Sequence, residues 1–196
     1  RATKYQQIVS EILLQRTKAE TVAKYYDTFF SKFPDWNALA NASLEELEEI
    51  MKPLGLYRHR ARRLYKLGED IRRRGGKIPG NENELRDSGF IGLYVTNAFE
   101  LFILRNRKPL LDVNMSRLLK RYFKPGDFID VRHDKEIQEL ANDIIEVRRC
   151  KELNWAILDY AALVCKSRNP LCGECVLNKH CKYYGLSQGD VTEEPE

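Results

Sequence analysis

Four cysteines near the carboxyl end constrain this chain more than any other feature of its sequence. They are spaced C-x6-C-x2-C-x5-C over 17 residues, with no regular pattern of apolar residues between them. Thiolates bind soft metals, so four of them this close together indicate a zinc ion or an iron–sulfur cluster. The candidate ligands of this predicted metal centre are Cys165, Cys172, Cys175 and Cys181.

The spacing favours an iron–sulfur cluster over zinc. Zinc sites usually contain two C-x2-C pairs, and only Cys172 and Cys175 form such a pair here. The other two arms are six and five residues long, which suits a bulky cubane better than a single ion. Disulfides are disfavoured because the cysteine count of five is odd and the sequence shows no secretory signal. The fifth cysteine, Cys150, is expected to be a structural thiol.

Apolar residues recur at helical spacing along nearly the whole sequence, and no segment carries a convincing strand signal. The predicted fold class is therefore all-α. A hydrophobic content of 43% suits a globular protein. No apolar run approaches the roughly 18 residues that span a bilayer, which excludes an integral membrane protein. The predicted helices are 4–33, 43–51 behind a capping box at Ser43, 58–74, 82–86, 93–104, 115–122 with Asn114 as N-cap, 135–147 and 152–164.

Positive charge is clustered, although the net charge is only +4. Local basic patches on a nearly balanced chain fit a polyanion such as nucleic acid. The alternative for each patch is an ordinary solvated helix face. The basic clusters lie within residues 58–63, 72–74, 105–108 and 117–121.

Three separated motifs point to one family. The first is the segment 11–17, the second is the glycine-punctuated hairpin and helix 89–98 followed by Asp112, and the third is the cysteine loop with the helix before it. In this order and at these separations they resemble the helix-hairpin-helix DNA glycosylases of the endonuclease III superfamily, over essentially the whole chain. The nearest resemblance is to the thymine glycosylases that act on T opposite G.

The resemblance implies a two-lobed helix-hairpin-helix glycosylase fold with a [4Fe–4S] cluster as cofactor. Residues 1–107 would form a six-helix barrel lobe, and 108–196 would form the iron–sulfur cluster lobe. The N-terminal residues that usually complete the cluster lobe are expected to be missing, since the chain begins at Arg1 rather than at Met. The acidic, turn-rich tail 187–196 is expected to be disordered.

Asp112 is the candidate for stabilising the reacting sugar. Cleavage of an N-glycosidic bond builds positive charge on the sugar, and a nearby carboxylate lowers that barrier electrostatically. Asp112 lies just before a predicted helix N-terminus, where the helix dipole favours a negative charge. By resemblance it occupies the catalytic aspartate position. On the sequence alone, a second capping residue is the simpler interpretation.

Tyr94 and Glu11 are the other two candidate catalytic residues. By resemblance, the lyase members of the family have a lysine at the position of Tyr94, whose amine forms a Schiff base with the sugar. Tyrosine has no amine, so we expect a monofunctional enzyme that leaves an abasic site. Glu11 interrupts an apolar stretch, where partial desolvation would raise the pKa of its carboxyl group and suit it to proton transfer. The simpler interpretations are a core tyrosine and an exposed helix-face glutamate.

The resemblance also implies which residues contact DNA. A pair in the first motif would fill the gap left by a flipped base, backbone amides of the hairpin would bind a phosphate, and the loop after Cys165 would meet the backbone. The hairpin departs from the family pattern Leu-Pro-Gly-Val-Gly, because Phe90 stands at the first glycine position. The candidate DNA-binding residues are Gln15, Arg16, Gly89, Ile91, Gly92, Lys166 and Arg168.

The leading hypothesis is a base excision repair glycosylase that hydrolyses the N-glycosidic bond of thymine or uracil mispaired with guanine. The alternatives are an adenine glycosylase acting on A opposite 8-oxoguanine or G, and a non-catalytic DNA-binding homologue with an atypical hairpin. Adenine glycosylases usually carry a further C-terminal domain, and only 15 residues follow Cys181 here. The expected partner is double-stranded DNA containing a mismatched or damaged base, with no membrane contact. A monomer is expected, inside the cell in the cytoplasm or nucleoid, or in the nucleus of a eukaryote.

Overall fold

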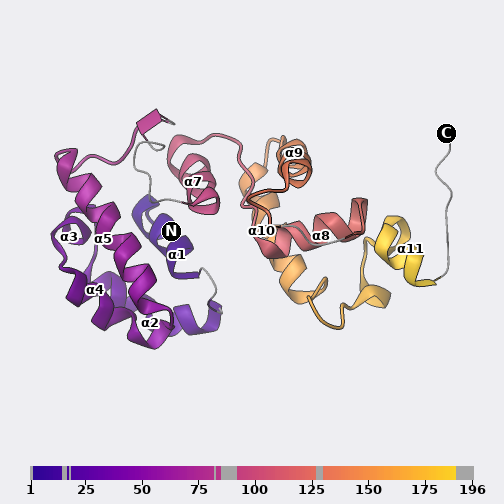
Figure 1. Ribbon diagram of the computed structural model, residues 1–196, viewed down its shortest axis with the longest axis horizontal. Helices are drawn as coiled ribbons and strands as arrows, with labels where there is room; N and C mark the ends of the chain where they lie inside the picture. Colours follow the sequence, from indigo (N-terminus) through magenta and orange to yellow (C-terminus); the bar gives the residue numbers. More distant parts are fainter. Residues whose placement is uncertain are drawn as a thin grey trace. The chain divides into compact units, whose positions relative to one another are not determined.

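The computed structural model describes residues 2–14, 17, 19–81, 83–84, 92–126 and 130–188. All regular elements within these residues are helical and none is a strand, so the predicted all-α fold class is confirmed. The chain divides into two compact units, Arg1–Asn106 and Arg107–Glu196 (Figure 1). In the described part of the chain, no helix has the length and apolar character needed to cross a membrane. The functional division into a barrel lobe (1–107) and a cluster lobe (108–196) stays a prediction.

Local signals set most helix boundaries in the first unit. The Ser43 side chain accepts a hydrogen bond from the Glu46 N–H, and the Glu46 carboxylate accepts one from the Ser43 N–H, which confirms the predicted capping box. Gly75 and Gly76 have positive φ at the end of the long basic helix, as glycines do after a helix C-terminus. The elements are α1 (Lys4–Leu14), α2 (Ala19–Lys32), α3 (Trp36–Asn41), α4 (Leu44–Met51), η1 (Lys52–Leu54), α5 (Tyr57–Arg73), α7 (Leu93–Phe99) and the π-helical η2 (Glu100–Leu104).

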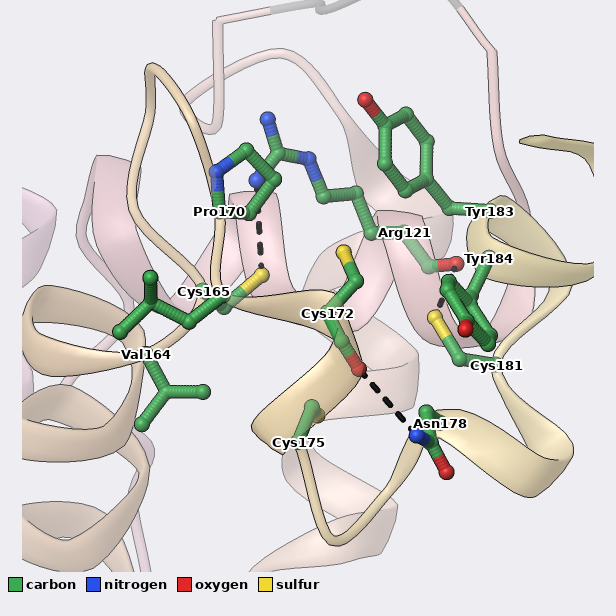
Figure 2. Close-up of a pocket in the computed structure, with 11 residues that line it drawn as sticks. Arg121, Val164, Cys165, Pro170, Cys172, Cys175, Asn178, Cys181, Tyr183 and Tyr184 are labelled. Carbon is green, nitrogen blue, oxygen red and sulfur yellow. Dashed lines mark hydrogen bonds between the residues drawn. The ribbon is translucent and has the colours of Figure 1, made fainter.

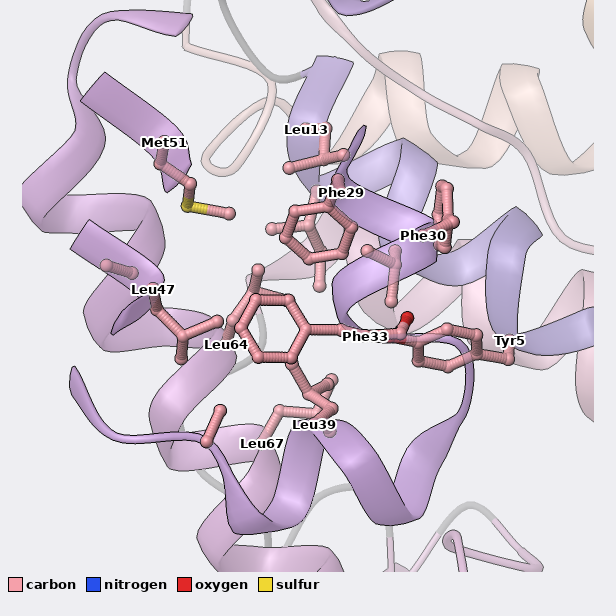
Figure 3. Packing of buried hydrophobic residues seen from close by; sticks show 14 of the residues in the cluster. Tyr5, Leu13, Phe29, Phe30, Phe33, Leu39, Leu47, Met51, Leu64 and Leu67 are labelled. Atoms are coloured by element: carbon pink, nitrogen blue, oxygen red, sulfur yellow. The ribbon is translucent and has the colours of Figure 1, made fainter. Parts of the chain in front are cut away.

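The core of the first unit is apolar and rich in aromatic rings (Figure 3). The rings of Tyr5 and Trp36 meet edge to face with centroids 4.8 Å apart, and the Tyr5 hydroxyl donates to the Phe33 carbonyl at 2.7 Å. Helices α3 and α5 approach closely at Gly68, where a Cβ atom would lie 2.7 Å from the Leu39 carbonyl oxygen. Helices α1 and α7, which carry two of the candidate site residues, contribute Tyr5 and Val95 to this core.

The second unit is a smaller helical core that leads into the cysteine loop. Its α8 packs against α9 and α10 through an apolar cluster that includes Leu111, Met115 and Ala161. The fully buried Asn154 on α10 accepts a hydrogen bond from the Leu110 N–H at 2.6 Å and so fixes the extended segment before Asp112. The elements are α8 (Val113–Phe123), α9 (Lys135–Ile144), α10 (Cys150–Leu163), η3 (Cys172–Glu174), η4 (Asn178–His180) and α11 (Lys182–Gln188).

One ion pair in the second unit is largely buried. Lys120 Nζ lies 2.6 Å from Asp134 Oδ2, and the two side chains are 13% and 9% exposed. The Asp134 side chain also caps α9 by accepting from the Ile137 N–H. The hydrogen bond from Lys120 is the main reason that the pKa of Asp134 lies below its usual value.

Several expectations about helix boundaries and about the tail are wrong. The helix predicted for 135–147 ends at Ile144, the last residue of α9. The apolar spacing over 4–33 belongs to two helices, α1 and α2, because the chain bends at Thr17, whose hydroxyl donates to the Leu54 carbonyl. The helix predicted for 115–122 begins at Val113, because Asp112 rather than Asn114 is its N-cap. The first two residues of the tail predicted to be disordered, 187 and 188, belong to α11. The rest of that tail lies outside the described residues.

Candidate functional site

Two of the candidate catalytic residues meet in the first unit. The Tyr94 hydroxyl on α7 donates a hydrogen bond to Glu11 Oε2 on α1 at 2.7 Å, across 83 residues of sequence. Both side chains are half-buried, and Glu11 lies between the buried residues Ile8 and Ile12 of α1. The phenol therefore orients a carboxylate in partly apolar surroundings. The geometry pairs the two residues, while their catalytic roles stay predictions.

Asp112 in the second unit is an N-cap. Its Oδ1 accepts from the backbone N–H groups of Asn114 and Met115, both at 2.8 Å, and its Oδ2 accepts from Asn114 Nδ2 at 2.7 Å. The positive end of the α8 dipole stabilises a negative charge at this position. The capping role considered for Asp112 is therefore real. It is compatible with the catalytic role, since both need a carboxylate with one set orientation.

Hydrogen bonds continue from Asp112 to the first cysteine. Asn114 Oδ1 accepts from Arg117 Nη1 at 3.0 Å, and Arg117 Nε donates to the Cys165 carbonyl at 2.9 Å. Arg117 Nη2 donates to the Ala161 carbonyl at 2.7 Å, which ties α8 to the end of α10. The candidate catalytic carboxylate and the cysteine loop thus share one polar network.

The four cysteines line a single pocket (Figure 2). Cys165 follows α10, and the 3-10 turns η3 and η4 carry the other three cysteines or end beside them. Burial raises the pKa of the Cys172 thiol, and the charges of the other three cysteines raise it further, so the four sulfurs interact electrostatically. Four neighbouring soft ligands in short, turn-rich arms fit an iron–sulfur cluster. The positive charge of its iron ions would offset the repulsion between the four thiolates.

A cation lies beside the cysteine pocket. Arg121 Nη1 is 3.5 Å from Cys165 Sγ and donates to the Lys166 carbonyl at 2.7 Å, while Nη2 donates to the Ser167 carbonyl at 3.2 Å. Its guanidinium also lies over the Tyr183 ring, 4.8 Å from the centroid. Arg121, expected in one of the basic clusters, therefore binds the backbone of the cysteine loop through its guanidinium. Arg117 and Arg121 are spaced i, i+4 on α8, which places both on one face of this helix.

A tyrosine that sequence reasoning missed also contacts a candidate ligand. Tyr160 on α10 donates to Cys175 Sγ at 3.2 Å and accepts from the Val176 N–H at 2.9 Å. Burial, and after it the hydrogen bond to Cys175, raises the pKa of the Tyr160 phenol, which keeps it protonated. The fifth cysteine, Cys150, is buried at the start of α10 and lines no part of this pocket.

The candidate DNA-binding residues are only partly within the described structure. Gly92 is exposed at the N-terminus of α7, with open space where a Cβ would lie. Lys166 and Arg168 are exposed on the loop whose backbone Arg121 holds. The others, Gln15, Arg16, Gly89 and Ile91, lie outside the described residues, as does Phe90.

An exposed turn joins η1 to α5. Leu56 has φ +46 and is 52% exposed, next to Gly55 with φ +68. Arg60, expected to be part of a basic patch, is instead buried, and its Nη1 donates to the carbonyls of Leu54 and Gly55 at 2.9 Å each. Its Nη2 donates to the Thr17 hydroxyl. A buried arginine therefore holds this turn in place, with the Leu56 side chain exposed on it.

Comparison with known proteins gave matches over almost the whole chain. Residues 9–154 match the family described as "HhH-GPD superfamily base excision DNA repair protein", and 165–181 match "Iron-sulfur binding domain of endonuclease III". A thymine-DNA glycosylase of Aeropyrum pernix is 35% identical, over 90% of this chain and 81% of that protein. A thymine/uracil-DNA glycosylase of Methanothermobacter thermautotrophicus is 31% identical, over 90% and 80%. The solved structure of a thermostable thymine-DNA glycosylase superimposes with a TM-score of 0.84 at 30% identity, covering 95% of this chain and 86% of that one.

Proposed function

Because this chain belongs to the HhH-GPD superfamily of base excision DNA repair proteins, we propose that it is a monofunctional DNA glycosylase that removes thymine or uracil mispaired with guanine. The family and the iron–sulfur site predicted from the sequence are both confirmed by the two family matches. The choice of base is supported by relatives named for thymine and uracil. The monofunctional reaction is supported by the tyrosine at position 94, where by resemblance the lyase members of the family have a lysine.

Asp112 is proposed to stabilise the positive charge that develops on the sugar. Its three hydrogen bonds and the α8 dipole hold its carboxylate in one orientation, so little reorganisation is needed when the charge appears. Electrostatic preorganisation of this kind commonly supplies the largest part of an enzymatic rate enhancement.

Glu11 and Tyr94 are proposed to contact the flipped base. A hydrogen-bonded carboxylate and phenol can present acceptor and donor groups to the polar edge of a pyrimidine. Tyr94 has no amine and forms no Schiff base with the sugar, so water completes the reaction and the product is an abasic site. In this proposal the Glu11 carboxylate is held in place by a hydrogen bond and transfers no proton.

The candidate DNA-binding residues and Leu56 are proposed to hold the duplex open. Extrusion of a base takes a few kcal/mol and is easier at a mismatch, so a wedge selects weakly paired positions. Gln15, Arg16 and Leu56 are the proposed wedge residues, and an arginine can also bind the orphan guanine. Lys166 and Arg168 would contact phosphates from the loop that Arg121 fixes. The protein would act on cellular DNA as a monomer.

The four cysteines are proposed to hold a cluster with a structural role. The bound cluster would cross-link the three arms of the loop and so keep its basic residues in place. Base release itself needs no electron transfer. Every chemical step proposed above is carried out by side chains and water.

The proposal is tested with labelled duplexes containing G·T, G·U, A opposite 8-oxoguanine, or an oxidised pyrimidine, incubated with the loaded protein with and without alkali. We expect release at G·T and G·U, with strand breaks only after alkali. Breaks without alkali would show a lyase and refute the monofunctional reaction. Release only of A opposite 8-oxoguanine would identify an adenine glycosylase, and binding without release of any base would identify a non-catalytic homologue. The Asp112→Asn protein, purified in parallel, controls for contaminating glycosylases.

A further inference from the structure

We propose that Tyr160 is a positioning residue of the iron–sulfur site, which donates a hydrogen bond to the bound thiolate of Cys175 and thereby raises the reduction potential of the cluster. The inference rests on the iron–sulfur site and is independent of which base the enzyme removes. Failure of the experiment below would therefore leave the proposed activity untouched.

The contact has the geometry of a hydrogen bond to sulfur. The Tyr160 oxygen lies 3.2 Å from Cys175 Sγ, and the tyrosine projects from α10 toward the turn that carries this cysteine. The side chain is half-buried, which limits competition from water. Cys175 lines the pocket with the other three cysteines, so its sulfur is a thiolate ligand once the cluster is bound.

A second hydrogen bond to the same oxygen comes from a donor, which leaves the sulfur as the acceptor for the tyrosine proton. The Val176 N–H donates to the Tyr160 oxygen at 2.9 Å and thus takes up one of its lone pairs. A phenol has a single proton, and a thiolate is only an acceptor. With a donor on one side and the sulfur on the other, the O–H of Tyr160 points at Cys175.

The expected consequence is a higher reduction potential. Reduction adds negative charge to the cluster and its sulfurs, so a hydrogen bond to a ligating sulfur stabilises the reduced state more than the oxidised state. Groups around the ligands of a metal commonly tune it in this way. Arg121 acts on a different ligand, Cys165, and remains unchanged in the comparison.

The test compares Tyr160→Phe with Val176→Pro. The first variant removes the O–H and keeps the ring. The second removes the N–H that donates to Tyr160 and otherwise changes only an exposed side chain. The turn tolerates proline, because Cys175 has φ −76 and ψ 120, the extended conformation needed before it. The Asn178 N–H donates to the Cys175 carbonyl, which puts the 81% exposed Val176 at the second position of a β-turn, where proline is favoured.

Reduction potentials are measured by protein-film electrochemistry on the loaded proteins, with iron and sulfide contents determined for each. We expect Tyr160→Phe to shift the reduction equilibrium toward the oxidised state by about tenfold, which is 59 mV for a one-electron couple. Val176→Pro should match the wild type within error. An unchanged potential in Tyr160→Phe would overturn the proposal, as would an equal shift in both variants, since that would implicate the shape of the turn.

A third protein covers the case in which Tyr160→Phe loses its cluster. Site-specific incorporation of 3-fluorotyrosine at position 160 keeps the ring and the hydroxyl but makes the phenol a stronger hydrogen-bond donor. The potential should then rise above that of the wild type. An unchanged or lower potential would refute the hydrogen bond as its cause.

Discussion

The substitution Asp112→Asn separates the capping role of this residue from its proposed catalytic role. The asparagine Oδ1 can still accept from the N–H groups of Asn114 and Met115, and asparagine caps helices as well as aspartate does. Its NH₂ group would replace Oδ2 and face the NH₂ of Asn114, so one hydrogen bond is lost, together with the charge–dipole interaction. These two losses amount to roughly 0.5–1.5 and 0.3–1 kcal/mol, small beside a typical stability of about 5–15 kcal/mol.

The effect on base release should be much larger. Removing a preorganised charge that stabilises the transition state costs on the order of 3–4 kcal/mol, by analogy with a lost oxyanion-hole donor, which is a rate loss of about 100- to 1000-fold. Single-turnover base release from a G·T duplex at saturating protein measures the chemical step. Binding of the same duplex should change by only a few-fold.

Asp35→Asn is the matched control, because Asp35 caps α3 in the other unit by accepting from the Ala38 N–H at 2.8 Å. It should show a comparable small change in unfolding midpoint and a normal rate of base release. If Asp112→Asn released the base within about tenfold of the wild-type rate, the carboxylate would be a cap alone, and the proposed mechanism would be wrong.

Three further outcomes are expected. Tyr94→Lys should gain lyase activity, seen as a covalent adduct with DNA on borohydride reduction, and the absence of any adduct would count against this residue lying beside the sugar. Gly68→Ala should destabilise the protein by about 1–3 kcal/mol in urea unfolding, since its Cβ would lie 2.7 Å from the Leu39 carbonyl oxygen; equal stability would mean that α3 and α5 can separate freely. Lys120 holds the pKa of Asp134 below its usual value, so the stabilisation from this pair should be complete above about pH 4 and should fall as acid protonates Asp134 in the folded protein. The difference in unfolding free energy between wild type and Asp134→Asn measures this, and a difference that does not change with pH would contradict it.

The features that the sequence predicted well depend on short-range interactions. The capping box at Ser43 involves residues three positions apart, and helical periodicity is a property of each segment alone. The cysteine arms span only 17 residues, so their spacing limits the metal centre before any tertiary packing is considered. Asp112 stands beside a helix N-terminus for the same local reason, although the sequence assigned the cap to Asn114.

Only the tertiary structure determined the hydrogen-bond partners of the site residues. The hydrogen bond from Tyr94 to Glu11 spans 83 residues and exists because α7 packs against α1. The sequence predicts Arg121 to be one of several surface cations. Packing of α8 against the loop after α10 instead directs its guanidinium to Cys165. Composition and spacing thus determined the chemistry available to this chain, an all-helical protein with a four-thiolate centre. Long-range packing determined which polar groups face one another, because hydrogen bonds between distant segments depend on how the helices pack, and no local pattern encodes that arrangement.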